Sequence, residues 1–210
     1  MSNQLIDYLL SCDFDQDAIT EGSSSTESSD WLIDIITTHA PEAKKIMEIG
    51  LNLGHSSDKL LTNTDSHITS FDLLEFDYSE FVVDYFKKYY ANRHDIISGD
   101  STIVVPQYAK ETNNKFDVIF IDGGHAYEIA KADLENCRIL SNKNTIVILD
   151  DVVRNGYFDG NPVFAQHWNY GPTKVWDEMV AAGIIEEIEG SYRVLDIIIW
   201  IGIWTRLYGG

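Results

Sequence analysis

Apolar residues follow two alternating patterns along this chain. Short continuous runs rich in β-branched residues are typical of strands covered on both faces, and apolar residues three or four positions apart are typical of helices. The runs predict strands at 45–49, 68–71, 95–98, 116–121 and 145–149. The helical spacing predicts helices at 4–10, 30–40, 79–90, 101–110, 126–140 and 173–182, and a further helix that begins at 56–61.

This alternation predicts a doubly wound, Rossmann-like α/β sheet. Two further apolar runs, 184–189 and 194–204, are expected to close it as an antiparallel C-terminal strand pair, so the predicted sheet is seven-stranded and mostly parallel. We expect a helical preface over residues 1–45 and a single domain over 46–210. Because ligands bind outside the carboxyl ends of the strands in such sheets, the residues after each strand are the candidates for chemistry.

Composition and charge narrow the class of protein. The chain has 210 residues, of which 44% are hydrophobic, and this excludes a disordered or collagenous protein. Acidic residues outnumber basic ones by 34 to 15, and the net charge of −19 comes without any run of Lys or Arg. Nucleic acid is therefore not an expected partner, since its phosphates attract basic surfaces.

Neither a membrane segment nor a disulfide framework is expected. The most apolar segment, 197–204, is far shorter than the roughly 20 residues that span a bilayer. Cys12 and Cys137 are the only cysteines, and the first residues lack the basic start of a signal peptide. We expect a cytoplasmic protein with no membrane partner.

The first strand runs into a turn that contains two glycines. Gly50 and Gly54 are four positions apart, and they lie between Glu48 and Ser56. Glycine lets the backbone approach a ligand closely, and a serine can cap the helix that follows. The pattern is not the G-x-G-x-x-G of dinucleotide sites, and a plain strand–turn–helix junction stays open as an alternative.

Acidic residues also follow the second and third strands. Asp72 lies about 20 residues beyond the glycine turn, which is the spacing of acids that bind ribose hydroxyls. Asp100, followed by Ser101, comes after the third strand, where it could face an adenine amino group. Both aspartates have an alternative role as helix caps.

Three acids and a histidine follow the fourth and fifth strands. Asp122 and His125 come after the fourth strand, and Asp150 and Asp151 come after the fifth. In a doubly wound sheet both ends lie near the middle of the ligand side, and oxygen-rich sets of this kind suit Mg²⁺ rather than zinc. Carboxylates this close would raise one another's pKa without a cation. The alternative is that the acids cap turns and His125 is an ordinary loop residue.

Taken in order, these motifs resemble those of a known family. They read E-I-G-x-x-x-G-H-S, F-D, G-D-S, F-D-V-I-F-I-D-G-G-H-A-Y-E and V-I-L-D-D. Over about residues 46–151 the chain resembles the class I S-adenosylmethionine-dependent methyltransferases. It is most similar to the small metal-dependent O-methyltransferases that include the macrocin O-methyltransferase-like enzymes. One departure is the turn at 142–144, which is Asn-Lys-Asn where many members have Gly–Gly or Pro–Gly.

The resemblance implies a role for individual residues. The cofactor-binding positions would be Glu48, Gly50, Gly54, Ser56, Asp72, Asp100, Ser101 and Asp122. The metal ligands would be Asp122, Asp150 and Asp151. His125 falls three residues after the first of these ligands, where macrocin-type enzymes keep a general base.

The implied function is O-methyl transfer from S-adenosylmethionine, with Mg²⁺ as a second cofactor. The acceptor would be a hydroxyl of a small molecule, and a sugar or glycoside is favoured over a catechol-like compound. Two other functions stay open. One is a non-catalytic methyltransferase-like domain that binds a nucleotide or a partner protein, and the other is an NAD-dependent oxidoreductase on a related sheet.

Two regions match no motif. The aromatic residues of 154–172 predict either a substrate-side loop or a surface loop anchored by buried rings. Residues 1–45 have three open roles, which are shaping substrate access, packing a homodimer, and covering the sheet.

Overall fold

The structure is a computed structural model that describes residues 4–19, 30–153, 157–158, 161–162, 167–188, 192–194 and 197–204. Its helices are α1 (Gln4–Leu9), the short 3₁₀ helix η1 (Gln16–Ile19), α2 (Asp30–His39), α3 (His55–Asn63), α4 (Ser79–Tyr90), α5 (Ser101–Glu111), α6 (Tyr127–Ile139) and α7 (Tyr170–Ala181). Its strands are β1 (Lys45–Ile49), β2 (His67–Asp72), β3 (His94–Ser98), β4 (Phe116–Ile121), β5 (Ser141–Leu149), β6 (Tyr157–Phe158), β7 (Asn161–Pro162), β8 (Ile185–Glu187), β9 (Tyr192–Val194) and β10 (Ile197–Trp204).

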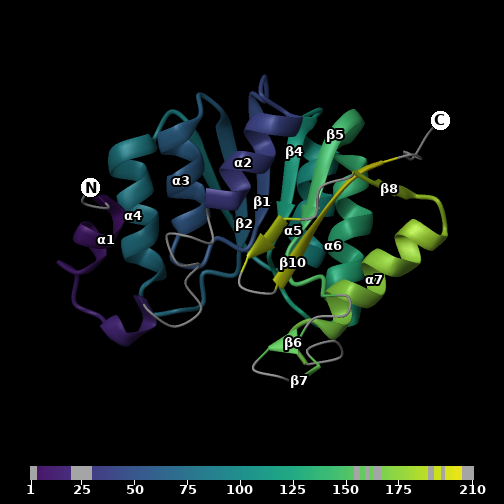
Figure 1. The fold of residues 1–210 in the computed structure, drawn as a ribbon. Helices are drawn as coiled ribbons and strands as arrows, with labels where there is room; N and C mark the ends of the chain where they lie inside the picture. Colours follow the sequence, from purple (N-terminus) through teal and green to yellow (C-terminus); the bar gives the residue numbers. More distant parts are fainter. Residues whose placement is uncertain are drawn as a thin grey trace.

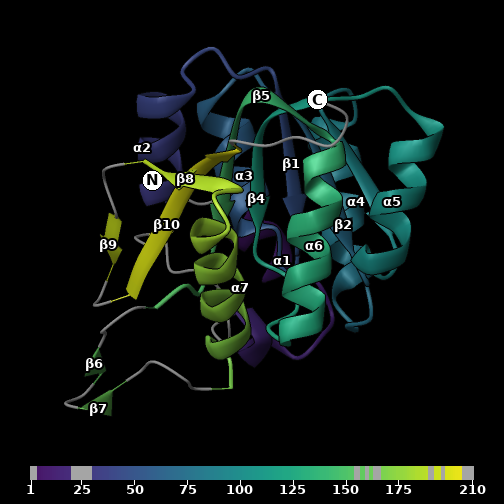
Figure 2. The same ribbon diagram turned by 90° about the vertical axis from the view of Figure 1, so that its right-hand side faces the viewer.

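One sheet forms the centre of the molecule (Figures 1 and 2), with the strand order β3-β2-β1-β4-β5-β10-β8. β1 to β5 are parallel, so the predicted Rossmann-like α/β fold is confirmed at this level. β10 is antiparallel to β5, and β8 and β9 are antiparallel to β10. Over the residues that the structure describes, the sheet has eight strands rather than the predicted seven, because β9 pairs with the first half of β10.

Helices cover both faces of this sheet (Figure 2). The core on one face joins the strands to α1–α4, and the core on the other joins them to α5–α7. The first core includes residues of the predicted preface, among them Leu9 and Trp31. The Trp31 ring meets Phe120 of β4 edge-on, with 5.7 Å between centroids. The N-terminal helices are therefore packed into the same core as the sheet, and the domain boundary at residue 45 remains a prediction.

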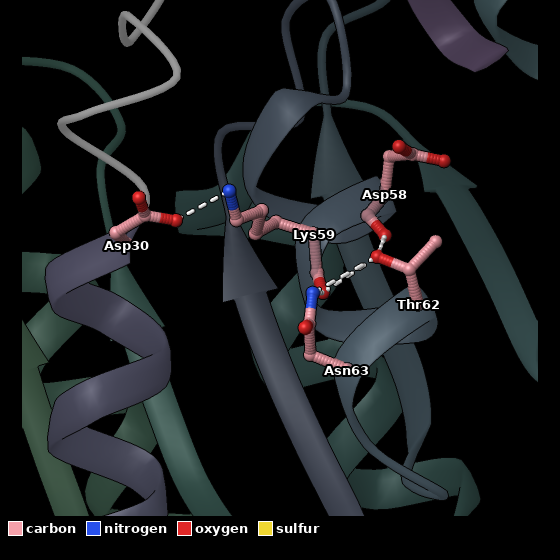
Figure 3. A network of polar contacts seen from close by, with 5 residues as sticks. All are labelled: Asp30, Asp58, Lys59, Thr62 and Asn63. Carbon is pink, nitrogen blue, oxygen red and sulfur yellow. Dashed lines mark hydrogen bonds and ion pairs between the residues drawn. The ribbon is translucent and has the colours of Figure 1, made fainter. Parts of the chain in front are cut away.

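A polar contact on the surface links α2 to α3 (Figure 3). Asp30, in the first turn of α2, forms an ion pair with Lys59 of α3. An acid in the first turn also interacts favourably with the positive end of its helix. Within α3, the carbonyl of Lys59 accepts hydrogen bonds from Asn63 and Thr62 (Figure 3). Both charged side chains are partly exposed, so the ion pair contributes little to the stability of the fold.

Element boundaries differ from prediction mainly around β5. This strand begins at Ser141 rather than 145, because Ser141 already pairs with Phe116, and the ladder is irregular before Val118. The Asn-Lys-Asn turn is thus built into the strand's first half, where the backbone N–H of Asn142 donates to Thr145 Oγ1 at 2.8 Å. About half of the predicted aromatic loop, at 154–156, 159–160 and 163–166, lies outside the described residues.

Among the helices that the structure describes, none is both long and apolar enough to cross a membrane.

Candidate active site

A cavity of about 420 Å³ lies at the carboxyl ends of the parallel strands. This is within the size range of small-molecule sites, and its position is the one expected for a doubly wound sheet. The predicted cofactor positions that line it are Gly50, Asp72, Asp100, Ser101 and Asp122. His125 lines it as well, so the cavity extends from the ends of β2 and β3 to the acids that follow β4.

Gly50 lets the ends of β1 and β4 meet at the cavity. Its φ of +92° lies in the region that favours glycine, and a Cβ there would be 1.9 Å from the carbonyl oxygen of Asp122. The backbone N–H of Asp122 donates to the carbonyl of Ile49 at 2.8 Å. No side chain can therefore replace hydrogen at position 50 unless the two strand ends move apart.

Asp72 fixes the backbone of the glycine turn. Its Oδ2 accepts hydrogen bonds from the backbone N–H groups of Leu51 at 2.8 Å and Asn52 at 3.0 Å. Its Oδ1 accepts one from Leu74 at 2.7 Å. The carboxylate thus ties the loop after β1 to the loop after β2. Oδ2 already accepts two hydrogen bonds, so Oδ1 is the oxygen that retains acceptor capacity for a ligand hydroxyl.

Asp100 caps α5, which was its predicted alternative role. Its Oδ1 accepts hydrogen bonds from the backbone N–H of Thr102 at 2.9 Å and from its hydroxyl at 2.7 Å. Asp100 is exposed and lines the cavity beside Ser101. The capping role leaves Oδ2 available to the cavity, so the structural and ligand-binding roles are compatible.

The other predicted cofactor positions do not line the cavity. Glu48 is fully buried and accepts hydrogen bonds from Ser56, from Ser57 at 2.6 Å and from Ser70 at 2.7 Å. Burial is the main cause of its raised pKa, which the three serine hydroxyls partly offset. Gly54 has a left-handed conformation and packs against α4. The position requires glycine, because a Cβ there would be 2.5 Å from the Phe86 ring. The cofactor roles of Glu48, Gly54 and Ser56 stay predictions.

Beneath the cavity lies a buried carboxylate, that of Asp133, which was not predicted from the sequence. Asp133 of α6 is fully buried, and neither of its carboxylate oxygens has a hydrogen-bond partner among the described residues. Burial raises its pKa to about 6, the nearby Ser101 hydroxyl lowers it without meeting hydrogen-bond geometry, and Asp100 raises it. A Cβ at Gly123 would lie 3.3 Å from this carboxylate, so Asp133 sits directly behind the cavity wall.

The acids after β4 and β5 gather with His125. Ligand atoms of Asp122, His125 and Asp151 lie within 4.8 Å of one another. The His125 Nε2 is 2.9 Å from Asp151 Oδ2. Asp151 has a positive φ of 59°, unusual for a residue other than glycine, and this turn brings it to the histidine. Asp150 is not part of this group, although both aspartates line a second cavity of about 10 Å³ beside it.

The negative charges of this cluster repel one another. Solvent in the cavity reaches Asp122, yet the protein atoms packed around its carboxylate raise its pKa, and the charges of Asp150 and Asp151 raise it further. Burial, followed by the charge of Asp151, raises the pKa of Asp150 to about 7. The hydrogen bond to Asp151 is the main cause of the raised pKa of His125. A cation would relieve this repulsion.

The donor set fits a hard cation. Carboxylate oxygens and one imidazole line a cavity of about 10 Å³, which is close to the smallest that holds one water molecule. Mg²⁺ commonly binds through one or two carboxylates and keeps several waters, for which the larger adjoining cavity has room. The set in the structure includes His125 and excludes Asp150, whereas the predicted ligands were Asp122, Asp150 and Asp151. Which acids bind a metal stays a prediction.

Several cavity residues were not predicted from the sequence. They are Asn52, Leu73, Glu75, Phe76 and Ile129. Leu73 and Phe76 are about half exposed, at 53% and 51%. Large apolar side chains in a loop between acids were the available signal, since such a loop has no evident core to join.

The fold and the cavity together define a Rossmann-like α/β protein with a ligand site at the carboxyl ends of its parallel strands. A family model described as a methyltransferase domain matches residues 47–152, half of the chain and all of the site described above. The chain belongs to this family. The enzyme class predicted from the sequence, an S-adenosylmethionine-dependent methyltransferase, is confirmed, while the macrocin-like subgroup stays a prediction.

Solved structures of similar fold are numerous. An O-methyltransferase from Bacillus cereus in complex with SAH is 18% identical, with a TM-score of 0.72 over 97% of this chain and 92% of that one. TomG from Streptomyces achromogenes, an O-methyltransferase involved in tomaymycin synthesis and solved with SAM, is 15% identical, with a TM-score of 0.73 over 98% and 92%. CalS11, a TDP-rhamnose 3′-O-methyltransferase of calicheamicin biosynthesis, is 18% identical, with a TM-score of 0.59 over 97% and 92%. No curated protein sequence matches the chain.

Proposed function

We propose that this protein transfers a methyl group from S-adenosylmethionine to a hydroxyl of a small molecule, with Mg²⁺ bound at the acid cluster. The observation that carries the proposal is the continuity of one cavity. It is lined at one end by Asp72, Asp100 and Ser101, and at the other by Asp122 and His125. A donor and an acceptor held at these two ends would meet at the wall formed by the β1 and β4 ends.

The donor end suits a nucleoside with a charged side arm. Asp72 and Asp100 each keep acceptor capacity for ribose hydroxyls or an amino group after making their internal hydrogen bonds. The apolar side chains of Leu73, Phe76 and Ile129 offer surfaces to a flat ring. S-adenosylmethionine would supply an electrophilic methyl group there.

The acceptor end suits a hydroxyl that must lose a proton. Bound Mg²⁺ would lower the pKa of an acceptor hydroxyl and orient it. Asp151 holds Nε2 of His125, which leaves Nδ1 as the ring nitrogen that can accept a proton. Asp151 thus orients a general base, and Asp122 lies beside both at the cavity.

A sugar or glycoside is the acceptor class we favour. The neighbour CalS11 is a TDP-rhamnose methyltransferase, and TomG is involved in tomaymycin synthesis, so folds of this kind serve small-molecule acceptors. The net charge of −19 opposes nucleic acid as an acceptor. Vicinal oxygens on a sugar could also share one cation, as those of a catechol would.

Calorimetric titration with SAM, SAH and NAD, each in Mg²⁺ and in EDTA, tests the proposal. We expect SAM and SAH to bind and NAD not to bind. NAD binding without SAM or SAH would contradict the methyltransferase proposal. Failure of all three to bind would favour a non-catalytic domain. An Asp100→Asn variant keeps the helix cap but loses a charge at the donor end, and it should bind SAH more weakly than an Asp95→Asn variant, which alters an exposed acid of β3 paired with His67.

A further inference from the structure

The N-terminal segment, residues 4–19, runs alongside α4 (Figure 1). α1 packs against α4, and Tyr8 of α1 contacts Tyr85 and Tyr89 of α4. Further along the segment, the half-buried Phe14 stacks on Phe81, with 5.8 Å between centroids. The segment therefore reaches the amino end of α4, which follows directly from the cavity loop after β2.

Tyr78 lies where this segment meets the cavity wall. It is buried, with 6% of its surface exposed, and its ring is 5.8 Å from Phe14 between centroids. It also stacks on the cavity residue Phe76 at 5.0 Å, with the ring planes 13° apart. Tyr78 thus contacts both a residue of the N-terminal segment and a residue of the cavity.

The hydroxyl of Tyr78 reaches the other wall of the cavity. It donates a hydrogen bond to Asn52 Oδ1 at 2.5 Å. Asn52 has a positive φ of 48°, and its backbone N–H donates to Asp72. Burial and the charges of Asp72 and Asp77 raise the pKa of Tyr78 to about 12, so the hydroxyl remains a donor at neutral pH. A single tyrosine therefore holds both the glycine turn and the loop after β2.

We propose that residues 4–19 brace the cofactor cavity, with Phe14 supporting Tyr78 and Tyr78 positioning Asn52 and Phe76. This inference rests on the proposed function, since it takes the cavity as the S-adenosylmethionine site. It gives the N-terminal segment a role in cofactor affinity and not only in covering the sheet. Tyr78 is a positioning residue, because it acts through Asn52 and Phe76, which line the cavity.

A pair of matched tyrosine variants tests the brace. Tyr78→Phe removes the hydroxyl that holds Asn52, and Tyr85→Phe removes one that donates to Asp58 at 2.6 Å, a residue that does not line the cavity. Both lose one buried hydrogen bond, so both should be less stable. Calorimetry with SAH should show an affinity about three- to tenfold weaker for Tyr78→Phe and unchanged for Tyr85→Phe, as one positioning hydrogen bond implies.

Two further measurements separate positioning from general loss of stability. In an Asn52→Gly background, which keeps the positive φ but removes Oδ1, Tyr78→Phe should have no additional effect on SAH affinity. Phe14→Leu should weaken SAH binding about two- to fivefold, whereas Leu10→Ala, at an exposed position on the same segment, should not. Because coupling is reciprocal, SAH should also slow amide hydrogen exchange in residues 4–19.

The outcomes distinguish this inference from the proposed function. Wild-type protein that fails to bind SAH contradicts the proposed function and the brace with it. Wild-type protein that binds SAH with the same affinity as Tyr78→Phe and Phe14→Leu contradicts the brace alone. Equal losses in Tyr78→Phe and Tyr85→Phe also contradict the brace, since they would show that lowered stability alone weakens binding.

Discussion

The two ends of the cavity differ in how their carboxylates are satisfied. At the ends of β2 and β3, Asp72 accepts three backbone hydrogen bonds, and Asp100 accepts two from Thr102. At the ends of β4 and β5, the acids lie close to one another, and burial together with mutual repulsion raises the pKa values of Asp122 and Asp150. The carboxylates of the donor end find hydrogen-bond donors within the protein. Those of the acceptor end need a proton or a cation to balance their charges.

This difference indicates how each end functions. Satisfied carboxylates stand in fixed positions, as recognition of one cofactor requires. Crowded carboxylates bind a cation strongly because the cation removes their repulsion.

Removal of metal should abolish turnover, because the acceptor hydroxyl would then lose its main source of acidity. We expect EDTA to reduce methyl transfer to background and Mg²⁺ to restore it, measured as SAH formation with an acceptor found by screening. Asp122→Asn should lower the rate of methyl transfer more than about 100-fold, which exceeds the loss usual for residues that only support a metal ligand. Asp95→Asn is the control. Full turnover in EDTA would rule out a catalytic metal.

His125→Ala should lower the turnover rate about 10²–10⁴-fold, which is the range for a general base. SAH affinity should be retained, because the donor end does not depend on this ring. His67→Ala is a matched control, since His67 pairs with Asp95, an exposed acid of β3, with 3.6 Å between the two side chains. A turnover rate that is unchanged in His125→Ala would assign proton removal to another group.

Gly50→Ala should push apart the ends of β1 and β4, which meet at the cavity. The added Cβ would clash with the Asp122 carbonyl at 1.9 Å, so we expect a loss of about 3 kcal/mol or more in the free energy of unfolding. Gly183→Ala is the control, because Gly183 also has a positive φ, of 60°, but nothing lies within 4 Å of its Cβ position. Its loss should be about 1 kcal/mol. Equal losses in urea unfolding would show that strand contact at Gly50 is unimportant.

Asp133→Asn should stabilise the protein at neutral pH. The folded-state pKa of about 6 is raised from 3.8, so the proton on this carboxyl favours folding below pH 4, and that contribution is lost as the pH rises through 6. The difference corresponds to at most about 3 kcal/mol, and we expect a gain of about 1–3 kcal/mol at pH 8. Urea unfolding at pH 5 and pH 8 should show the larger gain at pH 8. A gain independent of pH would exclude ionisation of Asp133 as the cause.

The sequence predicted the positions of the strands well because continuous β-branched runs belong to strands covered on both faces. It also predicted that Asp72, Asp100 and Asp122 would reach one cavity, since parallel strand ends share an edge. It did not indicate that Glu48 would turn inward to three serines, because the direction of a strand residue depends on register and on the helices above it. Tyr78, Asn52 and Asp133 were missed because their surroundings come from segments distant in sequence. Tyr78 donates to Asn52, and Asp133 lies behind Gly123.

The most direct test of the difference between the two ends of the cavity is Mn²⁺ binding, measured by electron paramagnetic resonance. Mn²⁺ is a paramagnetic substitute for Mg²⁺. Wild-type protein, Asp151→Asn and Asp100→Asn should be compared, because each variant removes one charge from one end of the same cavity. We predict one Mn²⁺ site in the wild type, an affinity at least about tenfold weaker in Asp151→Asn, and no change in Asp100→Asn. No binding by the wild type, or equal losses in the two variants, would contradict the account.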